Sequence, residues 1–275
     1  MAAKPVQRPA SATPVAPPAA RPLAGRHAVV TGASRGIGAA IARELARLGA
    51  ELTLVARNAD ALKPVAAELG ARTRVAEFAG DLTDENAANR AIAHATDTLG
   101  TVAILVNNVG GAESAPFVKT DAALWRRMID LNLTSVYLAA RAAVPAMIAA
   151  RFGRIVNVAS TAGLKGYPYV SAYVAAKHGV VGLTRALALE FAKTGITVNA
   201  VCPGYTDTPM LDAAIATIAA KTGRSADEAR AGLTAANPMG RLVTPEEVAA
   251  AVGWLCLPEA AAITGQTLAI AGGEV

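Results

Sequence analysis

The chain has 275 residues, of which 53% are hydrophobic and 17% charged, so it can bury a substantial core and is a poor candidate for disorder. Its net charge of +5 comes without basic runs interleaved with aromatic residues, which make up only 4% of the chain, and we expect no nucleic-acid partner. Two cysteines and three histidines are scattered without CxxC spacing, so we expect neither a disulfide framework nor a metal site.

Residues 1–25 predict a disordered tail rich in alanine and proline. They hold six of the fifteen prolines and eight alanines, without the apolar stretch of a signal peptide. A transit peptide is the alternative, because the segment has no acidic residue, but the prolines oppose an amphipathic helix.

From Arg26 onward, short β-branched runs alternate with longer segments rich in Ala, Leu, Arg and Glu. This alternation is typical of βαβ units, which form a parallel sheet with helices on both faces. The predicted strands are His27–Thr31, Glu51–Ala56, Arg74–Phe78, Val102–Val106, Arg154–Ala159, Thr197–Cys202 and Gln266–Ala271. The predicted helices are Ile37–Leu48, Asp60–Leu69, Glu85–Leu99, Ala122–Ala150, Ser171–Thr194 and Pro245–Leu257. The sequence therefore predicts one domain, residues 26–275, of the α/β class with a doubly wound seven-stranded parallel sheet.

One insertion, residues 205–242, precedes the last helix and strand. Its segments Asp212–Ala220 and Ser225–Ala235 have the composition of a short helical pair. An insertion at this place predicts a lid over a substrate site.

Every apolar stretch is interrupted by charged, Gly or Pro residues well before the roughly 18 residues that a membrane helix needs. We therefore expect no membrane partner. Unpaired cysteines and the lack of a targeting tract predict a cytoplasmic location.

A glycine-rich turn, Thr31–Gly38, follows the first predicted strand and opens into a helix. Glycine permits a tight turn and close backbone approach, and the helix N-terminus offers free N–H groups to a pyrophosphate. The spacing alone is weak, but the strand before it and the helix after it favour a dinucleotide site over a plain structural turn. The predicted contacts are Gly32, Ser34, Arg35, Gly36, Ile37 and Gly38.

The end of the second predicted strand indicates which dinucleotide is preferred. An NAD site needs a carboxylate there for the ribose hydroxyl, yet this chain has Arg57. Arg57 and Arg35 suit a 2′-phosphate, because the planar guanidinium matches phosphate oxygens. The sequence therefore predicts NADP(H) in preference to NAD(H); the alternative is two solvated loop arginines.

The candidate catalytic group is Ser160 at the end of a strand, with Tyr173 and Lys177 four residues apart on one helix face. An ammonium about 5 Å from the phenol, at an effective dielectric of about 20, would lower the tyrosine pKa from about 10 to near 8. That value suits a general acid and base, with Ser160 holding the substrate oxygen. A Tyr-x-x-x-Lys pair on its own is more often a surface contact.

Taken together, these residues resemble the classical short-chain dehydrogenases/reductases, in particular the 3-oxoacyl reductases, over about residues 26–275. The resemblance implies a Rossmann-type fold and a homotetramer or homodimer built through the two long helices. It is carried by the motifs Thr31–Gly38, Asp81-Leu82, Asn107–Gly110, Asn132, Ser160, Tyr173 with Lys177, Pro203-Gly204 and Ile263–Gln266.

The resemblance also implies roles at matching positions. Asp81 and Leu82 would contact the adenine, and Asn108 would line the adenosine through its backbone. Tyr173 and Lys177 would also contact the nicotinamide ribose, and Asn132 would hold a water that links Lys177 to solvent as a proton relay. Thr206 through its backbone and Thr208 through its side chain would fix the nicotinamide carboxamide, after a turn at Pro203 and Gly204 that also belongs to the cofactor site.

Three of these residues have structural alternatives: Asn132 could bridge backbone in a helix kink, Asn107 could brace strands, and Asp81 could cap a helix.

The function these features predict is an NADPH-dependent carbonyl reductase, or secondary alcohol dehydrogenase, acting on a small-molecule 3-oxoacyl thioester or a hydrophobic ketone. Arg151 and Lys193 lie where such reductases carry basic carrier-docking residues, or they are simply solvated. Alternatives are a reductase of free aromatic, polyketide or steroid-like ketones and, more remotely, a non-catalytic NADPH-binding protein. The residues predicted to line the substrate site are Ser160, Leu164, Tyr167, Tyr173, Tyr205 and Met210.

Overall fold

The computed structural model describes residues 21–275, and its centre is a seven-stranded parallel sheet in the order β3-β2-β1-β4-β5-β6-β7. Strands β1, β4, β5 and β6 are buried along their whole length, as expected for parallel strands covered on both faces. The predicted doubly wound α/β fold is confirmed. The strands are β1 His27–Thr31, β2 Glu51–Ala56, β3 Val75–Ala79, β4 Val102–Asn107, β5 Gly153–Val158, β6 Ile196–Pro203 and β7 Thr267–Ile270.

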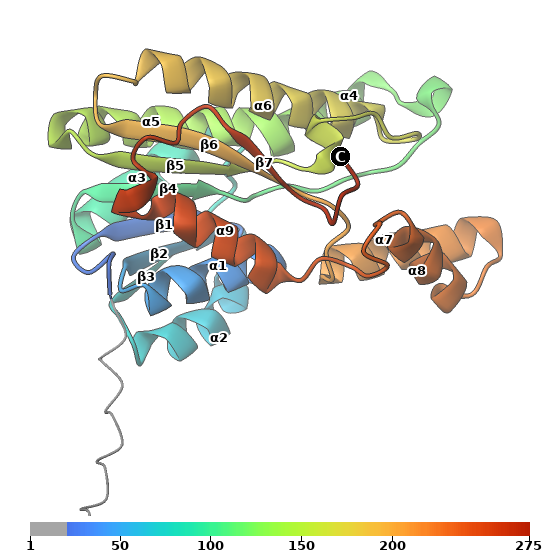
Figure 1. Ribbon diagram of the computed structural model, residues 1–275, viewed down its shortest axis with the longest axis horizontal. Coiled ribbons are helices and arrows are strands. Elements are labelled where there is room, and N and C mark those ends of the chain that lie inside the picture. Colours follow the sequence, from blue (N-terminus) through green and yellow to red (C-terminus); the bar gives the residue numbers. More distant parts are fainter. Residues whose placement is uncertain (1–20) are drawn as a thin grey trace, which may run out of the picture.

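Two helical layers enclose this sheet (Figure 1). The helices are α1 Gly36–Arg47, α2 Ala59–Gly70, α3 Glu85–Leu99, α4 Ala122–Ile129, α5 Ser135–Ala150, α6 Ser171–Glu190, α7 Pro209–Thr222, α8 Ala226–Ala235 and α9 Pro245–Cys256. One hydrophobic cluster joins α1, α2 and α9 to the sheet, and a second joins α3, α5 and α6 to its other face. The boundaries mostly lie within two residues of the predictions, but α6 ends at Glu190, four residues earlier than expected.

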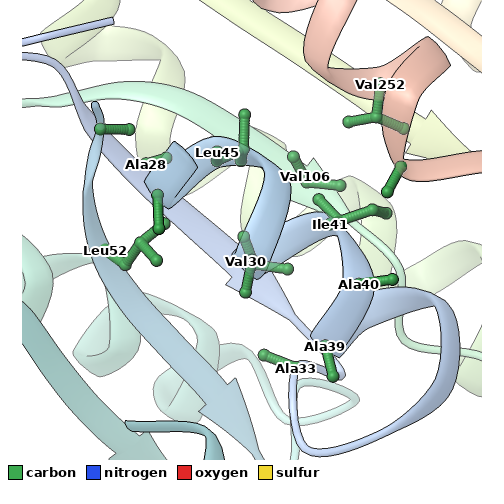
Figure 2. Packing of buried hydrophobic residues seen from close by; sticks show 14 of the residues in the cluster. Ala28, Val30, Ala33, Ala39, Ala40, Ile41, Leu45, Leu52, Val106 and Val252 are labelled. Atoms are coloured by element: carbon green, nitrogen blue, oxygen red, sulfur yellow. The ribbon is translucent and has the colours of Figure 1, made fainter. Parts of the chain in front are cut away.

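Helix α1 lies close to the sheet because its inner face is built from small and branched apolar residues. Figure 2 shows Ala40, Ile41 and Leu45 of α1 packed beside Val30 of β1, with the buried Val252 of the neighbouring helix α9 near Ile41. The contact between α1 and α9 is tight enough that a Cβ added at Gly253 would lie 2.9 Å from Cγ of Glu44. This packing fixes the N-terminus of α1, and therefore the glycine turn, against the carboxyl end of β1.

The folded part of the chain begins earlier than the predicted boundary at residue 25. Residues 22–25 form a turn, in which Leu23 is 1% exposed and its N–H donates to the carbonyl oxygen of Leu48. The rest of the predicted tail, residues 1–20, lies outside the described residues.

The predicted helix Ala122–Ala150 is continuous in direction but changes its winding. A π-helical turn, Asp130–Thr134, separates α4 from α5. The buried Asn132 amide causes the bulge, because its Nδ2 donates both to the Met128 carbonyl oxygen and to that of Gly111 in a distant loop. Such bulges occur often at functional sites.

By length and composition alone, the helical run Ala122–Ala150 is apolar enough to cross a membrane. This was not predicted from the sequence, where every apolar stretch was expected to be too short for a membrane helix. In the fold, its residues Leu138, Ala143 and Met147 are buried in the cluster that faces β4 and β5. These buried residues of the helix therefore belong to the core.

The predicted helical pair of the insertion is present as α7 and α8. These helices stand beside the body of the molecule, apart from the other helices (Figure 1), and share a small core of Leu211, Ile215 and Ala229. Thr208 caps α7, and Ser225 caps α8 in a capping box with Glu228. Because this pair has a hydrophobic cluster of its own, it is built as one unit.

Candidate active site

The glycine turn has the backbone that the sequence predicts for a pyrophosphate cradle. Gly32 and Gly36 adopt positive φ values of 65° and 54°, which side chains other than glycine rarely tolerate. A Cβ at Gly38 would lie 2.2 Å from the carbonyl oxygen of Gly32, so only glycine lets α1 approach the turn this closely. Arg35, the N-cap of α1, makes no side-chain cap, which leaves the N–H groups of the first turn for a ligand.

Arg35 and Arg57 are both exposed near this turn. The Ala33 N–H donates to the Val55 carbonyl oxygen, which joins the turn to the end of β2, two residues before Arg57. Within residues 21–275 neither arginine has a carboxylate partner. The glycines, the uncapped N–H groups and the two arginines together fit a phosphorylated dinucleotide.

The residues predicted on the adenosine side have structural roles as well. Asn108 Nδ2 donates to the carbonyl oxygens of Thr31 and Gly32, so its side chain braces the glycine turn. Asp81 accepts from the N–H and hydroxyl of Thr83, and the cap of α3 is Asp84. Leu82 is buried in the core. The backbone of Asn108 and the exposed carboxylate of Asp81 stay candidates for contacts with the nucleotide.

Ser160, Tyr173 and Lys177 converge at the carboxyl end of β5. Ser160 follows this strand, and its Oγ accepts from the Ala162 N–H at 3.1 Å. Lys177 is 3% exposed, its Nζ donates to the Val158 carbonyl oxygen at 2.8 Å, and it lies 5.7 Å from the centroid of the Tyr173 ring. The strand end and the first turns of α6 therefore bring a hydroxyl, a phenol and an ammonium together.

Asn132 joins this group from the π-turn between α4 and α5. A Cβ built at Gly110 would lie 2.9 Å from Asn132 Oδ1 and 3.4 Å from Lys177 Nζ, so both side chains pack against the same glycine. Asn132 Oδ1 also accepts from the Gly111 N–H at 3.0 Å. Asn132 therefore bridges backbone groups at the π-turn, as the structural alternative predicted. The same position also places its side-chain amide beside Lys177.

The prediction of a lowered pKa for Tyr173 is wrong, because the structure raises this pKa. Burial raises the pKa of Tyr173 above its ordinary value, partly offset by the neighbouring Ser160 hydroxyl. Burial also lowers the pKa of Lys177 to about 8. Coulomb's law between two partners omits this desolvation, which disfavours the charged form of each group. The phenol is therefore held as a proton donor.

The depressed pKa of Lys177 predicts a pH-dependent contribution to stability. The pKa is about 8 in the folded protein and 10.5 ordinarily, so between these values the unfolded chain binds more protons and the free energy of unfolding rises with pH. We expect the unfolding free energy of wild type, relative to Lys177→Met, to rise by about 1 kcal/mol between pH 8 and pH 9.

Urea titrations of both proteins at these two pH values measure this quantity. The buried cysteines and tyrosines are present in both proteins, so their contributions largely cancel in the difference; the exception is Cys202, whose pKa the Lys177 charge lowers. A difference that stays flat or falls with pH would show that the ammonium is not buried as described.

The segment after β6 connects the catalytic group to the glycine turn. Thr206 is buried, and its hydroxyl donates to the Gly204 carbonyl oxygen. The Thr208 methyl group lies 3.3 Å from where a Cβ of Gly36 would be. The residues from Pro203 to Thr208 thus cross from the end of the sheet to the N-terminus of α1, where a bound dinucleotide would extend.

On the substrate side, Tyr167 and Tyr205 meet edge to face with ring centroids 6.3 Å apart, and Tyr167 Oη is 2.7 Å from Thr161 Oγ1. Leu164 is half-buried, whereas Met210 is 53% exposed at the start of α7. Sequence reasoning missed Glu274, whose carboxylate accepts a hydrogen bond from Tyr167. The ending Gly-Gly-Glu-Val carries no pattern that would have found it.

Asn107 behaves as the strand-bracing amide that the sequence suggested. Its Nδ2 donates to Asn157 Oδ1, and Asn157 Nδ2 donates to the Thr184 hydroxyl. This buried chain ties β4 and β5 to α6, the three elements that carry the site.

Comparisons with known proteins show which family the chain resembles. The family described as short chain dehydrogenase matches residues 26–219. A protein of Streptomyces violaceoruber, named as a ketoacyl reductase of the granaticin polyketide synthase, is 44% identical over 269 residues, which are 96% of this chain and 97% of that protein. The 3-oxoacyl-[acyl-carrier-protein] reductase of Vibrio cholerae is 38% identical over 251 residues, 91% of this chain and 98% of that protein.

Among solved structures, a crystal structure of a variant of the actinorhodin polyketide ketoreductase with NADPH matches with a TM-score of 0.88. It is 38% identical, and the match covers 93% of this chain and 98% of that one.

Proposed function

Since the chain belongs to the short-chain dehydrogenase family, we propose that it is an NADPH-dependent ketoreductase that reduces a 3-oxoacyl thioester or another hydrophobic ketone. Family and relatives make it an oxidoreductase that acts on CH–OH groups, binds a nicotinamide cofactor and takes a small ketone or acyl substrate. The observation that carries the proposal is the convergence of Ser160, Tyr173, Lys177 and Asn132 beside the glycine turn.

The side chains divide the work of a carbonyl reduction as follows. NADPH, when bound, supplies the hydride that the carbonyl carbon receives. Ser160 holds the carbonyl oxygen by a hydrogen bond, and Tyr173 donates the phenol proton to that oxygen. The raised pKa of Tyr173 keeps this proton available at neutral pH. Lys177 stabilises the phenolate that this transfer leaves on Tyr173. Asn132, which packs with Lys177 against Gly110, guides a proton from solvent back to the phenolate.

Preference for NADPH rests on Arg35 and Arg57. Both guanidinium groups are exposed near the glycine turn, and the end of β2 offers no carboxylate for a ribose hydroxyl. An NADPH-containing structure of a ketoreductase with 38% identity supports this assignment.

A 3-oxoacyl thioester is the favoured substrate because two relatives are named as ketoacyl and 3-oxoacyl-[acyl-carrier-protein] reductases. Arg151, directly after α5, and Lys193, three residues after α6, are both exposed, so that an acidic carrier can reach them. A free hydrophobic ketone is the second candidate, favoured by the apolar and aromatic lining of Leu164, Tyr167 and Tyr205.

NADPH oxidation, followed at its absorbance band, tests the proposal with acetoacetyl-coenzyme A, its N-acetylcysteamine analogue, and free cyclic and aromatic ketones. We expect turnover with the thioesters at a higher kcat/KM than with the free ketones. Tight NADPH binding without reduction of any member would instead identify a non-catalytic nucleotide-binding protein.

Assembly and location stay predictions. The homotetramer or homodimer expected through α5 and α6 is supported by exposed apolar side chains on the α4–α6 layer, including Trp125, Tyr137 and Leu189. A cytoplasmic location is supported by two buried cysteines in the free state, Cys202 and Cys256.

A further inference from the structure

Glu274, four residues after β7, has a carboxylate that the fold buries. Its side chain is 4% exposed, and Lys165 Nζ lies 3.1 Å from Oε1. Tyr167 Oη donates to the same oxygen, and Lys165 Nζ also donates to the main-chain oxygen of Glu274 at 3.1 Å. A carboxylate is stable away from water only when it is paired and hydrogen-bonded, so these contacts hold the two segments together.

The second carboxylate oxygen of Glu274 faces the start of the lid segment. A Cβ built at Gly204 would lie 2.9 Å from Glu274 Oε2 and 3.2 Å from Ala271 Cβ. Gly204 is the residue at which the chain leaves β6 toward Thr206 and α7. The carboxylate is therefore in contact with the point from which the lid departs.

The two glycines before Glu274 contact the other end of the lid. A Cβ at Gly272 would lie 2.0 Å from Oδ1 of Asn237, and one at Gly273 would lie 3.7 Å from Cγ of Pro238. Asn237 is buried, and its Oδ1 accepts from the Met239 N–H. Residues 272–274, here called the C-terminal clasp, thus touch the lid segment where it begins and where α8 has ended.

The clasp also reaches the catalytic group through a short series of contacts. Tyr167, held by Glu274, is 2.7 Å from the Thr161 hydroxyl, and Thr161 is the next residue after Ser160. Tyr167 also meets the Tyr205 ring, next to Gly204. Burial, and next the hydrogen bond to Glu274, raise the pKa of Tyr167 above its ordinary value, so the phenol stays a donor to the carboxylate.

We propose that Glu274 is a positioning residue of the reaction, whose carboxylate fastens the loop from Thr161 to Tyr167 to the base of the lid and so sets the shape of the substrate pocket. The inference rests on the proposed function, because it concerns the pocket in which a ketone meets Ser160 and Tyr173. Glu274 acts through Tyr167 and Gly204 and needs no contact with the reacting atoms.

Two variants test the roles of the Glu274 charge and of the Tyr167 hydroxyl one at a time. Glu274→Gln keeps the size of the side chain and removes its charge, while Tyr167→Phe removes a single oxygen. We expect each to raise KM for the best thioester about tenfold, because a hydrogen bond to a charged group is lost or weakened. The kcat is expected to change less than about threefold, and the Kd for NADPH less than about twofold.

The double variant is expected to fall short of the sum of the two single effects, because both changes act on the hydrogen bond between Tyr167 and Glu274, while the ion pair with Lys165 is lost only through Glu274→Gln. Hydrogen exchange in residues 161–170 is expected to accelerate in all three variants. Glu259→Gln, a change of the same kind at an exposed residue, is the matched control and should behave as wild type in every measurement.

Wild-type KM and wild-type exchange in Glu274→Gln, or effects that simply add in the double variant, would overturn the proposal. If Glu274→Gln does not fold, as judged by NADPH binding, Tyr167→Phe decides by the same measurements. If the wild type reduces no ketone, the proposed function fails, while the exchange measurement still decides whether Glu274 holds the loop.

Discussion

Replacing Tyr173 with phenylalanine is expected to lower kcat by a factor of about 10²–10⁴. The ring and its packing on α6 stay, but the proton donor is gone, so the alkoxide that forms as hydride arrives has no nearby acid. Because the glycine turn and the arginines are untouched, the Kd for NADPH is expected to stay within about twofold of wild type.

Steady-state rates with the best substrate of the panel, together with NADPH titrations followed by fluorescence, measure both quantities for Tyr173→Phe. Tyr137→Phe, at an exposed position on α5, is the matched control and should retain full activity. Full turnover in Tyr173→Phe would remove the phenol from the mechanism.

The second large effect is expected in cofactor preference. Changing both Arg35 and Arg57 to serine removes two guanidinium groups that are placed to bind the 2′-phosphate, each such hydrogen bond to a charged group contributing about 1.5–3 kcal/mol. We therefore expect the ratio of kcat/KM with NADPH to kcat/KM with NADH to fall by a factor of about 10² or more. Most of the change should come from a higher KM for NADPH, because the contact is remote from the carbonyl.

The same ratio, measured for Arg90→Ser, is the control, since Arg90 is an exposed arginine on α3. A wild-type enzyme with equal kcat/KM for both cofactors would contradict the role given to the arginines. So would a double variant whose ratio is unchanged.

The elements of the sheet could be predicted because local sequence specifies them. The predicted runs Glu51–Ala56 and Val102–Val106 are mostly apolar, include β-branched residues and are bounded by turn residues, and both lie in buried strands of the fold. The glycine turn could also be predicted from the sequence, because the positive φ values at Gly32 and Gly36 favour glycine over every other residue.

The features that could not be predicted from the sequence depend on contacts between residues that are far apart in the chain. The π-turn Asp130–Thr134 contains neither glycine nor proline and arises because Asn132 bonds to Gly111, 21 residues earlier in the chain. The pKa of Tyr173 was mispredicted for a similar reason: the burial that raises it cannot be read from a spacing of four residues between tyrosine and lysine. Glu274 lies 107 residues from Tyr167 in the chain, and no local sequence pattern predicts the contact between them.

Transfer of label from NADPH to the product follows the hydride itself and shows whether the phenol of Tyr173 is needed for its transfer. The wild-type enzyme is incubated with acetoacetyl-coenzyme A and NADPH that carries deuterium on the transferred position of C4, and the alcohol product is examined by mass spectrometry. We expect one deuterium at the carbinol carbon in the wild-type product and almost no product from Tyr173→Phe. An unlabelled alcohol, or equal product from both proteins, would contradict this expectation.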